Sequence, residues 1–306
     1  MPNSTENLNI TPFGEETPRR AVNVLEPHDV ASPLIFASPH SGRDYPGELL
    51  KNSRLDRHAL RQSEDCYVDL LFDEAPRFGA PLLRALFPRA YVDVNRARDE
   101  LDPRMFADDI PKKADTRSSR VIAGLGVIPR IVADGQDIYA RKLYYIDAKR
   151  RLAACYEPYH EALRRLIDEA RSRFGVAIVI DCHSMPSAGG APFRPGEPRI
   201  DFVLGDRFGS SCDPGIVEET ELALRGFGYQ VARNAPYAGG YVASSYGRPR
   251  EGVHVLQIEI NRALYLDERR IARSGGFDPL RRNMTALIEH LSATRRDQLR
   301  PPQAAE

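Results

Sequence analysis

The chain has 306 residues, of which 42% are hydrophobic, so it is long enough to bury a large core. Its 43 Lys and Arg residues equal its 43 Asp and Glu residues. A formal net charge of zero gives no electrostatic reason to expect a nucleic acid or a membrane surface as a partner.

The cysteines and the N-terminus indicate a reducing compartment. Cys66, Cys155, Cys182 and Cys212 form no CxxC pair and no spacing typical of a disulfide-rich domain, so we expect reduced thiols. Residues 1–16 lack the basic start and apolar stretch of a signal peptide. No apolar run approaches the roughly 20 residues that span a bilayer. We therefore expect a cytoplasmic protein with no membrane partner.

Helical patterns alternate with apolar, strand-like runs along the chain. In chain order we predict a strand at 33–40, a helix at 63–79, strands at 80–87 and 90–96, a helix at 141–174, strands at 176–183 and 200–206, a helix at 214–226, strands at 228–234 and 252–261, and a helix at 277–296. Continuous apolar strands indicate a sheet that is covered on both faces. The predicted fold is a three-layer α/β/α sandwich with a mostly parallel, mixed central sheet.

Several residues indicate where these elements begin and end. Ser63 is a good N-cap for the first predicted helix, and Gly79 is a good stop. Pro158 is expected to kink or divide the helix at 141–174. Residues 1–30 and 294–306 are expected to be an irregular arm and tail. With no repeat and no clear linker in between, residues 1–306 are predicted to form a single domain.

Polar side chains stand near the carboxyl ends of four predicted strands. His40 follows the first apolar run, His183 ends a second, Glu259 lies near the end of a third, and Asn95 and Arg96 end a fourth. Each of them alone is compatible with a strand that simply reaches the surface. In open α/β sheets, however, ligands bind at the carboxyl ends of strands, so together these residues indicate a functional site.

Two imidazoles and a carboxylate match the donors of a hydrolytic zinc site. Catalytic zinc takes three protein ligands, lowers the pKa of a bound water towards about 7 and polarises the scissile carbonyl. We expect Zn2+, or another divalent metal, to bind His40 and His183. The third ligand is expected in the first turn of the next helix, from Glu64 or Asp65. Acids there also stabilise the helix dipole without any metal.

A second acid must then move the proton from the water to the leaving nitrogen. Strand alternation puts Glu259 on one face with Gln257, so a buried carboxyl with a raised pKa is expected there. Asp181 shares the face of His183 in the same way. It is either a partner of that imidazole or the end of a buried strand.

A long segment rich in Gly and Pro, at 234–252, precedes the strand that carries Glu259. Long loops in compact domains are often functional. As a functional loop it would close over the substrate, with Tyr246 or Arg248 holding a carboxylate. The alternative is a surface hairpin.

At these residues the chain resembles the N-formylglutamate amidohydrolase (deformylase) family. The matching stretches fall in order from residue 33 to about 268: SPHSGRDYP, SEDCYVDLLFD, YVDVNRARDELDP, GLGVIPRI, DCHSM, LGDRFGSSC and AGGYVASSYGRPREGVHVLQIEINRALYLDE. The resemblance implies a metal-dependent hydrolase with a fold like that of zinc carboxypeptidases. It also implies release of formate from N-formyl-L-glutamate.

The resemblance also implies roles for individual residues. His40 and His183 match the metal ligands, and Asp65 matches the third ligand, with Glu64 as the alternative. Glu259 in QIEIN matches the catalytic acid. Arg96 in DVNR looks like the arginine that steadies the substrate carboxylate or the oxyanion, beside Asn95; bidentate pairing of arginine with carboxylate suits that role.

Three functional hypotheses follow. The first is a zinc-dependent hydrolase of a small N-acyl amino acid, above all N-formyl-L-glutamate, with Glu259 as general base and acid. The second is a zinc deacylase or a carboxypeptidase-like hydrolase that acts on a larger amide. The third is a non-catalytic homologue that binds metal or ligand, which the presence of Glu259 disfavours because such a protein has no need of that acid.

Overall fold

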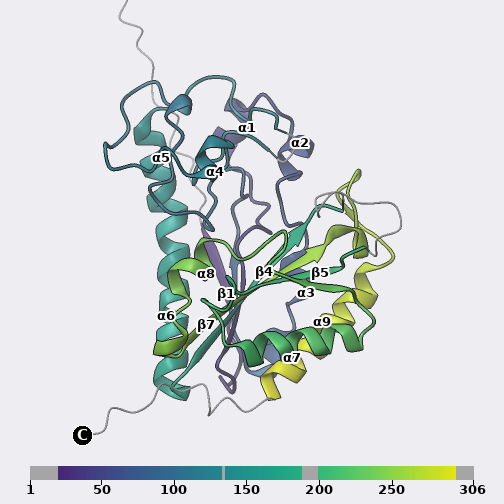
Figure 1. Cartoon of the computed structure of the whole chain (residues 1–306). Helices are drawn as coiled ribbons and strands as arrows, with labels where there is room; N and C mark the ends of the chain where they lie inside the picture. Colours follow the sequence, from purple (N-terminus) through teal and green to yellow (C-terminus); the bar gives the residue numbers. More distant parts are fainter. Residues whose placement is uncertain (1–19, 133–134, 188–198, 294–306) are drawn as a thin grey trace, which may run out of the picture.

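The computed structural model describes residues 20–132, 135–187 and 199–293. In these ranges a seven-stranded sheet lies between layers of helices (Figure 1). Its spatial order is β1 (Val22–Leu25), β3 (Leu82–Ala85), β2 (Leu34–Ser38), β4 (Ala177–Met185), β7 (Val253–Asn261), β5 (Phe202–Gly205) and β6 (Val231–Arg233). The central strands β3, β2, β4 and β7 are parallel, whereas β1 pairs antiparallel with β3 and β5 pairs antiparallel with β7. The edge strand β6 is parallel to β5. The predicted mostly parallel, mixed sheet is confirmed.

The helices of the described ranges cover both faces of this sheet and its carboxyl end. They are α1 (Gly47–Asn52), α2 (Arg57–Arg61), α3 (Val68–Leu71), α4 (Ser119–Ile122), α5 (Tyr145–Arg151), α6 (Glu157–Phe174), α7 (Pro214–Gly226), α8 (Tyr241–Tyr246) and α9 (Phe277–Ala293). The long α6 lies along one face, α7 and α9 lie on the other, and α1, α2 and α4 gather above one end of the strands (Figure 1). A small hairpin of β8 (Leu266–Asp267) and β9 (Ala272–Arg273) follows β7.

Strand alternation divides the interior into two cores. In β2, Ile35 and Ala37 join the core on the α6 side, whereas Leu34 and Phe36 join the core on the α7 and α9 side. Every residue of β2, β4 and β7 is buried, which is why these strands appear in the sequence as continuous apolar runs. Cys182 packs in the core on the α7 and α9 side, on the opposite face of β4 from Asp181 and His183.

Two predicted elements are wrong. The predicted helix at 63–79 is broken, because Tyr67 adopts a left-handed conformation (φ 63°) and only α3 and the 3-10 turn Ala75–Phe78 form, ending at Gly79 as expected. Ser63 does not cap a helix; its hydroxyl donates to the carbonyl of Leu60.

The predicted strand at 90–96 is a series of turns. Both sides of β3 are already occupied by β1 and β2, so this segment cannot join the sheet next to the strand that it follows. Its backbone instead meets the segment above the sheet, where the amide of Asp93 donates to the carbonyl of Val127. This path carries Asp93 and Asn95 across the carboxyl ends of the central strands.

The remaining boundaries agree closely with the sequence. The predicted helix at 141–174 forms as α5 and α6 joined by the π-helical turn Leu152–Tyr156, which falls just before Pro158. The arm at 1–30, which we expected to be irregular, instead contains the edge strand β1, which pairs with β3. Residues 294–306, the expected tail, lie outside the described residues. All four cysteines are buried free thiols. Of the helices in the described ranges, none is both long enough and apolar enough to span a bilayer.

The loop after β2 approaches the loop after β3 too closely to accept a side chain at Gly42. A Cβ there would lie 2.0 Å from the carbonyl oxygen of Phe87. We predict that Gly42→Ala lowers the free energy of unfolding by about 1–3 kcal/mol, as overpacking does, measured by denaturant titration. Gly226→Ala is the control, because a Cβ there meets nothing and alanine favours the end of α7. Equal stability of Gly42→Ala and the wild type would contradict the close approach.

Candidate active site

Three adjacent parallel strands bring the predicted polar residues to one edge of the sheet. His40 lies two residues after the end of β2. His183 and Glu259 each lie two residues before the end of their strands, β4 and β7. In the β4–β7 ladder His183 and Glu259 are direct partners. Because these strands are neighbours and run the same way, their carboxyl ends meet at the same place.

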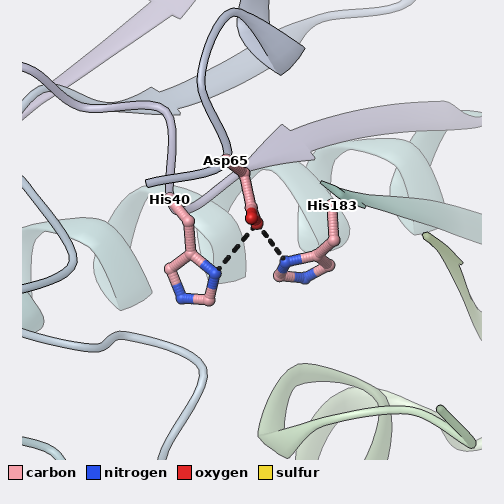
Figure 2. A group of neighbouring side chains, drawn as sticks. All are labelled: His40, Asp65 and His183. Atoms are coloured by element: carbon pink, nitrogen blue, oxygen red, sulfur yellow. Dashed lines mark hydrogen bonds and ion pairs between the residues drawn. The ribbon is translucent and has the colours of Figure 1, made fainter. Parts of the chain in front are cut away.

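His40, Asp65 and His183 form a compact, buried group (Figure 2). One carboxylate oxygen of Asp65, Oδ2, lies 3.3 Å from Nδ1 of His40 and 3.1 Å from Nδ1 of His183. One donor atom from each residue lies within 4.8 Å of the other two, a spacing that a metal ion can bridge. The donor set, two imidazoles and a carboxylate, is one that zinc and similar divalent ions accept.

Asp65 is fixed from several sides. Its other carboxylate oxygen, Oδ1, accepts hydrogen bonds from Arg262 Nη2 and Ser184 Oγ, both at 3.2 Å. Its amide donates to the carbonyl of His40 at 3.0 Å. These contacts leave Oδ2 facing the two imidazoles.

Glu64, the alternative third ligand, lies away from the imidazoles. It accepts a hydrogen bond of 2.5 Å from Tyr45 Oη and pairs with the guanidinium of Arg61. The carboxylate that meets both histidines is therefore that of Asp65.

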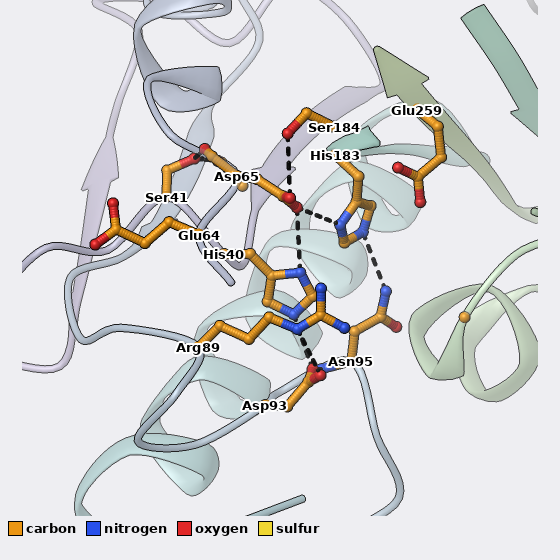
Figure 3. Close-up of polar contacts among 12 residues, drawn as sticks. His40, Ser41, Glu64, Asp65, Arg89, Asp93, Asn95, His183, Ser184 and Glu259 are labelled. Atoms are coloured by element: carbon orange, nitrogen blue, oxygen red, sulfur yellow. Dashed lines mark hydrogen bonds and ion pairs between the residues drawn. The ribbon is translucent and has the colours of Figure 1, made fainter. Parts of the chain in front are cut away.

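The outer nitrogens of both imidazoles meet further carboxylates. Figure 3 shows Asp93 beside His40 and Asn95 beside His183. His40 Nε2 lies 2.8 Å from Asp93 Oδ1, and His183 Nε2 lies 2.9 Å from Asp181 Oδ2. Asn95 Nδ2 lies 3.0 Å from that same His183 nitrogen and donates to Asp181. Carboxylate partners of this kind keep a proton on Nε2, so each Nδ1 could bind a metal in place of its hydrogen bond to Asp65. Asp181, which the sequence left open, is thus the partner of an imidazole.

The buried charges of this group favour a cation at its centre. Burial would raise the pKa of Asp65, but hydrogen bonds from His183 and His40 hold it well below the ordinary value. Burial would likewise lower the pKa of His183, but the Asp181 charge raises it well above the ordinary value. The pKa of Asp65 falls because two imidazoles face it, and the pKa of His183 rises because carboxylates surround it. The carboxylates of Asp65, Asp93 and Asp181 lie around the two imidazoles, an environment that a divalent cation fits.

Glu259 lies beside this group without joining it. Its Oε1 accepts a hydrogen bond of 2.9 Å from Gln257 Nε2, its neighbour on the same face of β7. Burial raises the pKa of Glu259 to about 7, opposed by His183 and assisted by Asp65. Figure 3 shows its carboxylate next to the His183 ring. A carboxyl so placed can exchange a proton with a group held in front of the histidines.

These side chains border one cavity of about 260 Å³. Its wall includes His40, Asp65 and Glu259. His183 lies behind the wall, where its ring nitrogens contact Asp65 and Asn95, two residues that do line the cavity. The remaining polar and charged side chains of the wall are Gln62, Ser63, Arg89, Asn95, Arg96, Arg120, Ser184, Tyr237, Gln257 and Arg262.

Arg96 is part of this wall, but its guanidinium is already engaged. Its Nε donates to the carbonyl of Leu125 at 2.9 Å and its Nη1 to the carbonyl of Asn95 at 2.7 Å. Asp93 lies 3.6 Å from its Nη2. Arg96 therefore ties the segment above the sheet to the turns that carry Asp93 and Asn95.

The structure places Tyr246 and Arg248 outside the cavity wall. Tyr246 Oη lies 2.8 Å from His160 Nδ1, and Arg248 Nη1 donates to the carbonyls of Ser244 and Gly247. The segment at 234–252 does reach the cavity, but through residues 236–240, and it contains the helix α8.

Sequence reasoning missed Arg89, Asp93 and Arg262. Asp93 lies two positions before Asn95, and Arg262 three positions after Glu259, so proximity to predicted site residues was a usable signal for both. Arg89 donates to Asp93, four positions later in the same series of turns, at 2.9 Å.

Comparisons with known proteins agree with this geometry. The family model described as N-formylglutamate amidohydrolase matches residues 32–266. An N-formylglutamate deformylase of Pseudomonas putida is 28% identical over 248 residues, which cover 80% of this chain and 86% of the relative. One of Pseudomonas aeruginosa is 28% identical over 239 residues, covering 77% and 83%. The crystal structure of N-formylglutamate amidohydrolase from Ralstonia eutropha JMP134 superposes with a TM-score of 0.84 at 38% identity, covering 89% of this chain and 97% of that one.

Proposed function

This chain belongs to the N-formylglutamate amidohydrolase family, and we propose that it hydrolyses N-formyl-L-glutamate to formate and L-glutamate. The observation that carries the proposal is the buried group of His40, Asp65 and His183 with Glu259 beside it, at the wall of one cavity. A volume of about 260 Å³ suits a small N-acyl amino acid better than the larger amide of a peptide.

The metal of this reaction is proposed to be Zn2+ or another divalent ion, held by His40, Asp65 and His183. When bound, it would polarise the formyl carbonyl and acidify a water molecule. Asp93 and Asp181 would keep the imidazoles oriented towards it, as carboxylate partners of metal-bound histidines do.

Glu259 is proposed to move the proton. It would take a proton from the attacking water as the oxygen bonds to the formyl carbon. It would then give that proton to the amide nitrogen as the C–N bond breaks, releasing formate and the free amine. Gln257 positions the carboxylate by its hydrogen bond to Oε1.

Arg96 and Asn95 are proposed to steady the substrate end of the site. Both belong to the cavity wall, and Asn95 also reaches His183. The substrate carries two carboxylates, and the guanidinium groups of the wall offer complementary charge. Tyr246 and Arg248 take no part in this proposal, because neither side chain reaches the wall.

We predict that the wild-type enzyme releases formate from N-formyl-L-glutamate, loses this activity after dialysis against a chelator, and regains it on addition of Zn2+. A formate dehydrogenase-coupled assay measures the release. Full activity in chelator-treated protein shown to be metal-free by elemental analysis would overturn the metal-dependent reaction.

We predict that Asp65→Asn loses bound zinc whereas Glu64→Gln keeps it, because only Asp65 meets both imidazoles. Metal content per folded chain, measured by elemental analysis with circular dichroism as the folding control, decides between them. Loss of zinc in Glu64→Gln with retention in Asp65→Asn would reverse the assignment.

We predict that Glu259→Gln keeps its metal and lowers kcat by about 10²–10⁴-fold, the usual contribution of a general acid–base group. Glu251→Gln is the matched control, because Glu251 is exposed in the turn before β7 and does not border the cavity. Turnover of Glu259→Gln at the rate of Glu251→Gln would show that Glu259 does not move the proton.

A further inference from the structure

We propose that Arg120 binds the side-chain carboxylate of the substrate and thereby makes the site selective for acidic N-formyl amino acids. This inference rests on the proposed function and names the residue that sets substrate choice at the same site. Arg120 lies in α4, within the segment that covers the carboxyl end of the sheet.

The segment that carries Arg120 is tied to the reacting centre. The carbonyl of Leu125 accepts from Arg96 Nε at 2.9 Å, and the carbonyl of Val127 accepts from the amide of Asp93 at 2.9 Å. The helix itself begins at Ser118, whose hydroxyl accepts from the amide of Val121. The backbone of the segment that carries Arg120 is therefore tied by hydrogen bonds to the turns that carry Asp93 and Arg96.

The segment that supplies Arg120 to the wall also supplies apolar side chains to it. Leu125, Pro129 and Ile131 border the cavity together with Arg120. A glutamyl side chain has the same make-up, with two methylene groups followed by a carboxylate. Methylenes against the apolar side chains and a carboxylate at the guanidinium would satisfy both parts of the wall.

The other arginines of the wall already have protein partners. Arg262 donates to Asp65, Ser184 and the carbonyl of Glu64, whereas Arg96 donates to two carbonyls. The Nε of Arg89 donates to Asp93. Within the ranges that the structure describes, no hydrogen bond or ion pair engages the guanidinium of Arg120, so its donors remain available to a ligand.

The wall also carries more positive than negative charge. Arg89 and Arg96 share the carboxylate of Asp93, which in turn holds His40. Burial lowers the pKa of Arg96 to about 10; Asp93 opposes this shift, and the charges of Arg89 and Arg120 add to it. The guanidinium groups are therefore close enough to repel one another, and an anionic substrate would relieve that repulsion.

The test compares two substrates that differ only in charge, N-formyl-L-glutamate and its neutral isostere N-formyl-L-glutamine. We expect Arg120→Met to lower kcat/KM for the glutamate substrate about 10- to 100-fold, the value of one hydrogen bond to a charged group. The loss should appear in KM, because the contact is present in both ground and transition states. The glutamine substrate should be unaffected.

Arg117→Met is the matched control, because Arg117 is exposed in the same segment but does not border the cavity. It should leave both substrates unchanged, and Arg120→Lys should retain part of the preference because it keeps the charge. If Arg120→Met has the same ratio of kcat/KM values as the wild type, the inference is overturned while the proposed function stands.

If the wild type releases formate from neither substrate, the proposed function is overturned, and calorimetry with glutarate decides the inference. A glutarate Kd raised about tenfold in Arg120→Met, and unchanged in Arg117→Met, would support a carboxylate site at Arg120. Equal Kd values in the wild type and Arg120→Met would overturn it.

Discussion

The site depends on one oxygen atom, Oδ2 of Asp65, which faces the Nδ1 atoms of both His40 and His183. The two histidines come from neighbouring parallel strands, so the sheet sets the distance between them. Asp65 comes from a turn, and it is held there by Ser184 at the end of β4 and by Arg262 just after β7. Three strand ends thus converge on one carboxylate, and the group forms only when the sheet has assembled.

Concentrating so many buried carboxylates costs stability unless positive charge offsets it. Arg262 offsets Asp65, and Arg89 and Arg96 offset Asp93, while Asp181 and Glu259 meet the amide groups of Asn95 and Gln257. The arginines therefore stabilise the buried carboxylates at the edge of the cavity. Buried charges of this kind lower stability and are typical of functional sites. Their burial and mutual interactions also explain why residues with strongly shifted pKa values lie together at this end of the sheet.

The sequence was most informative where structure is local. β2, β4 and β7 are continuous apolar runs, so the sequence alone predicts where these strands end. The polar residues at or near those ends, His40, His183 and Glu259, can therefore be identified without the structure. The sequence was less informative where tertiary contacts override local pattern. The left-handed Tyr67 breaks a segment with clear helical spacing, and the alternation at 90–96 reflects burial without strand pairing. Arg120 could not be singled out at all, because its place at the cavity follows from contacts between segments far apart in the chain.

The described residues divide the work of the site between two parts of the fold. The central strands carry His183 and Glu259, whose pairing cannot shift by one residue without turning each side chain to the other face, and His40 lies two residues after the end of β2. The segment above the sheet carries Arg120, and it is joined to the site through backbone carbonyls that accept from Arg96 and from the amide of Asp93. Carbonyl contacts of this kind do not depend on the side chains of the residues that supply them. The cavity wall that this segment forms can therefore change in sequence while His40, His183 and Glu259 remain in place, so a substitution there would reshape the cavity without moving the buried group.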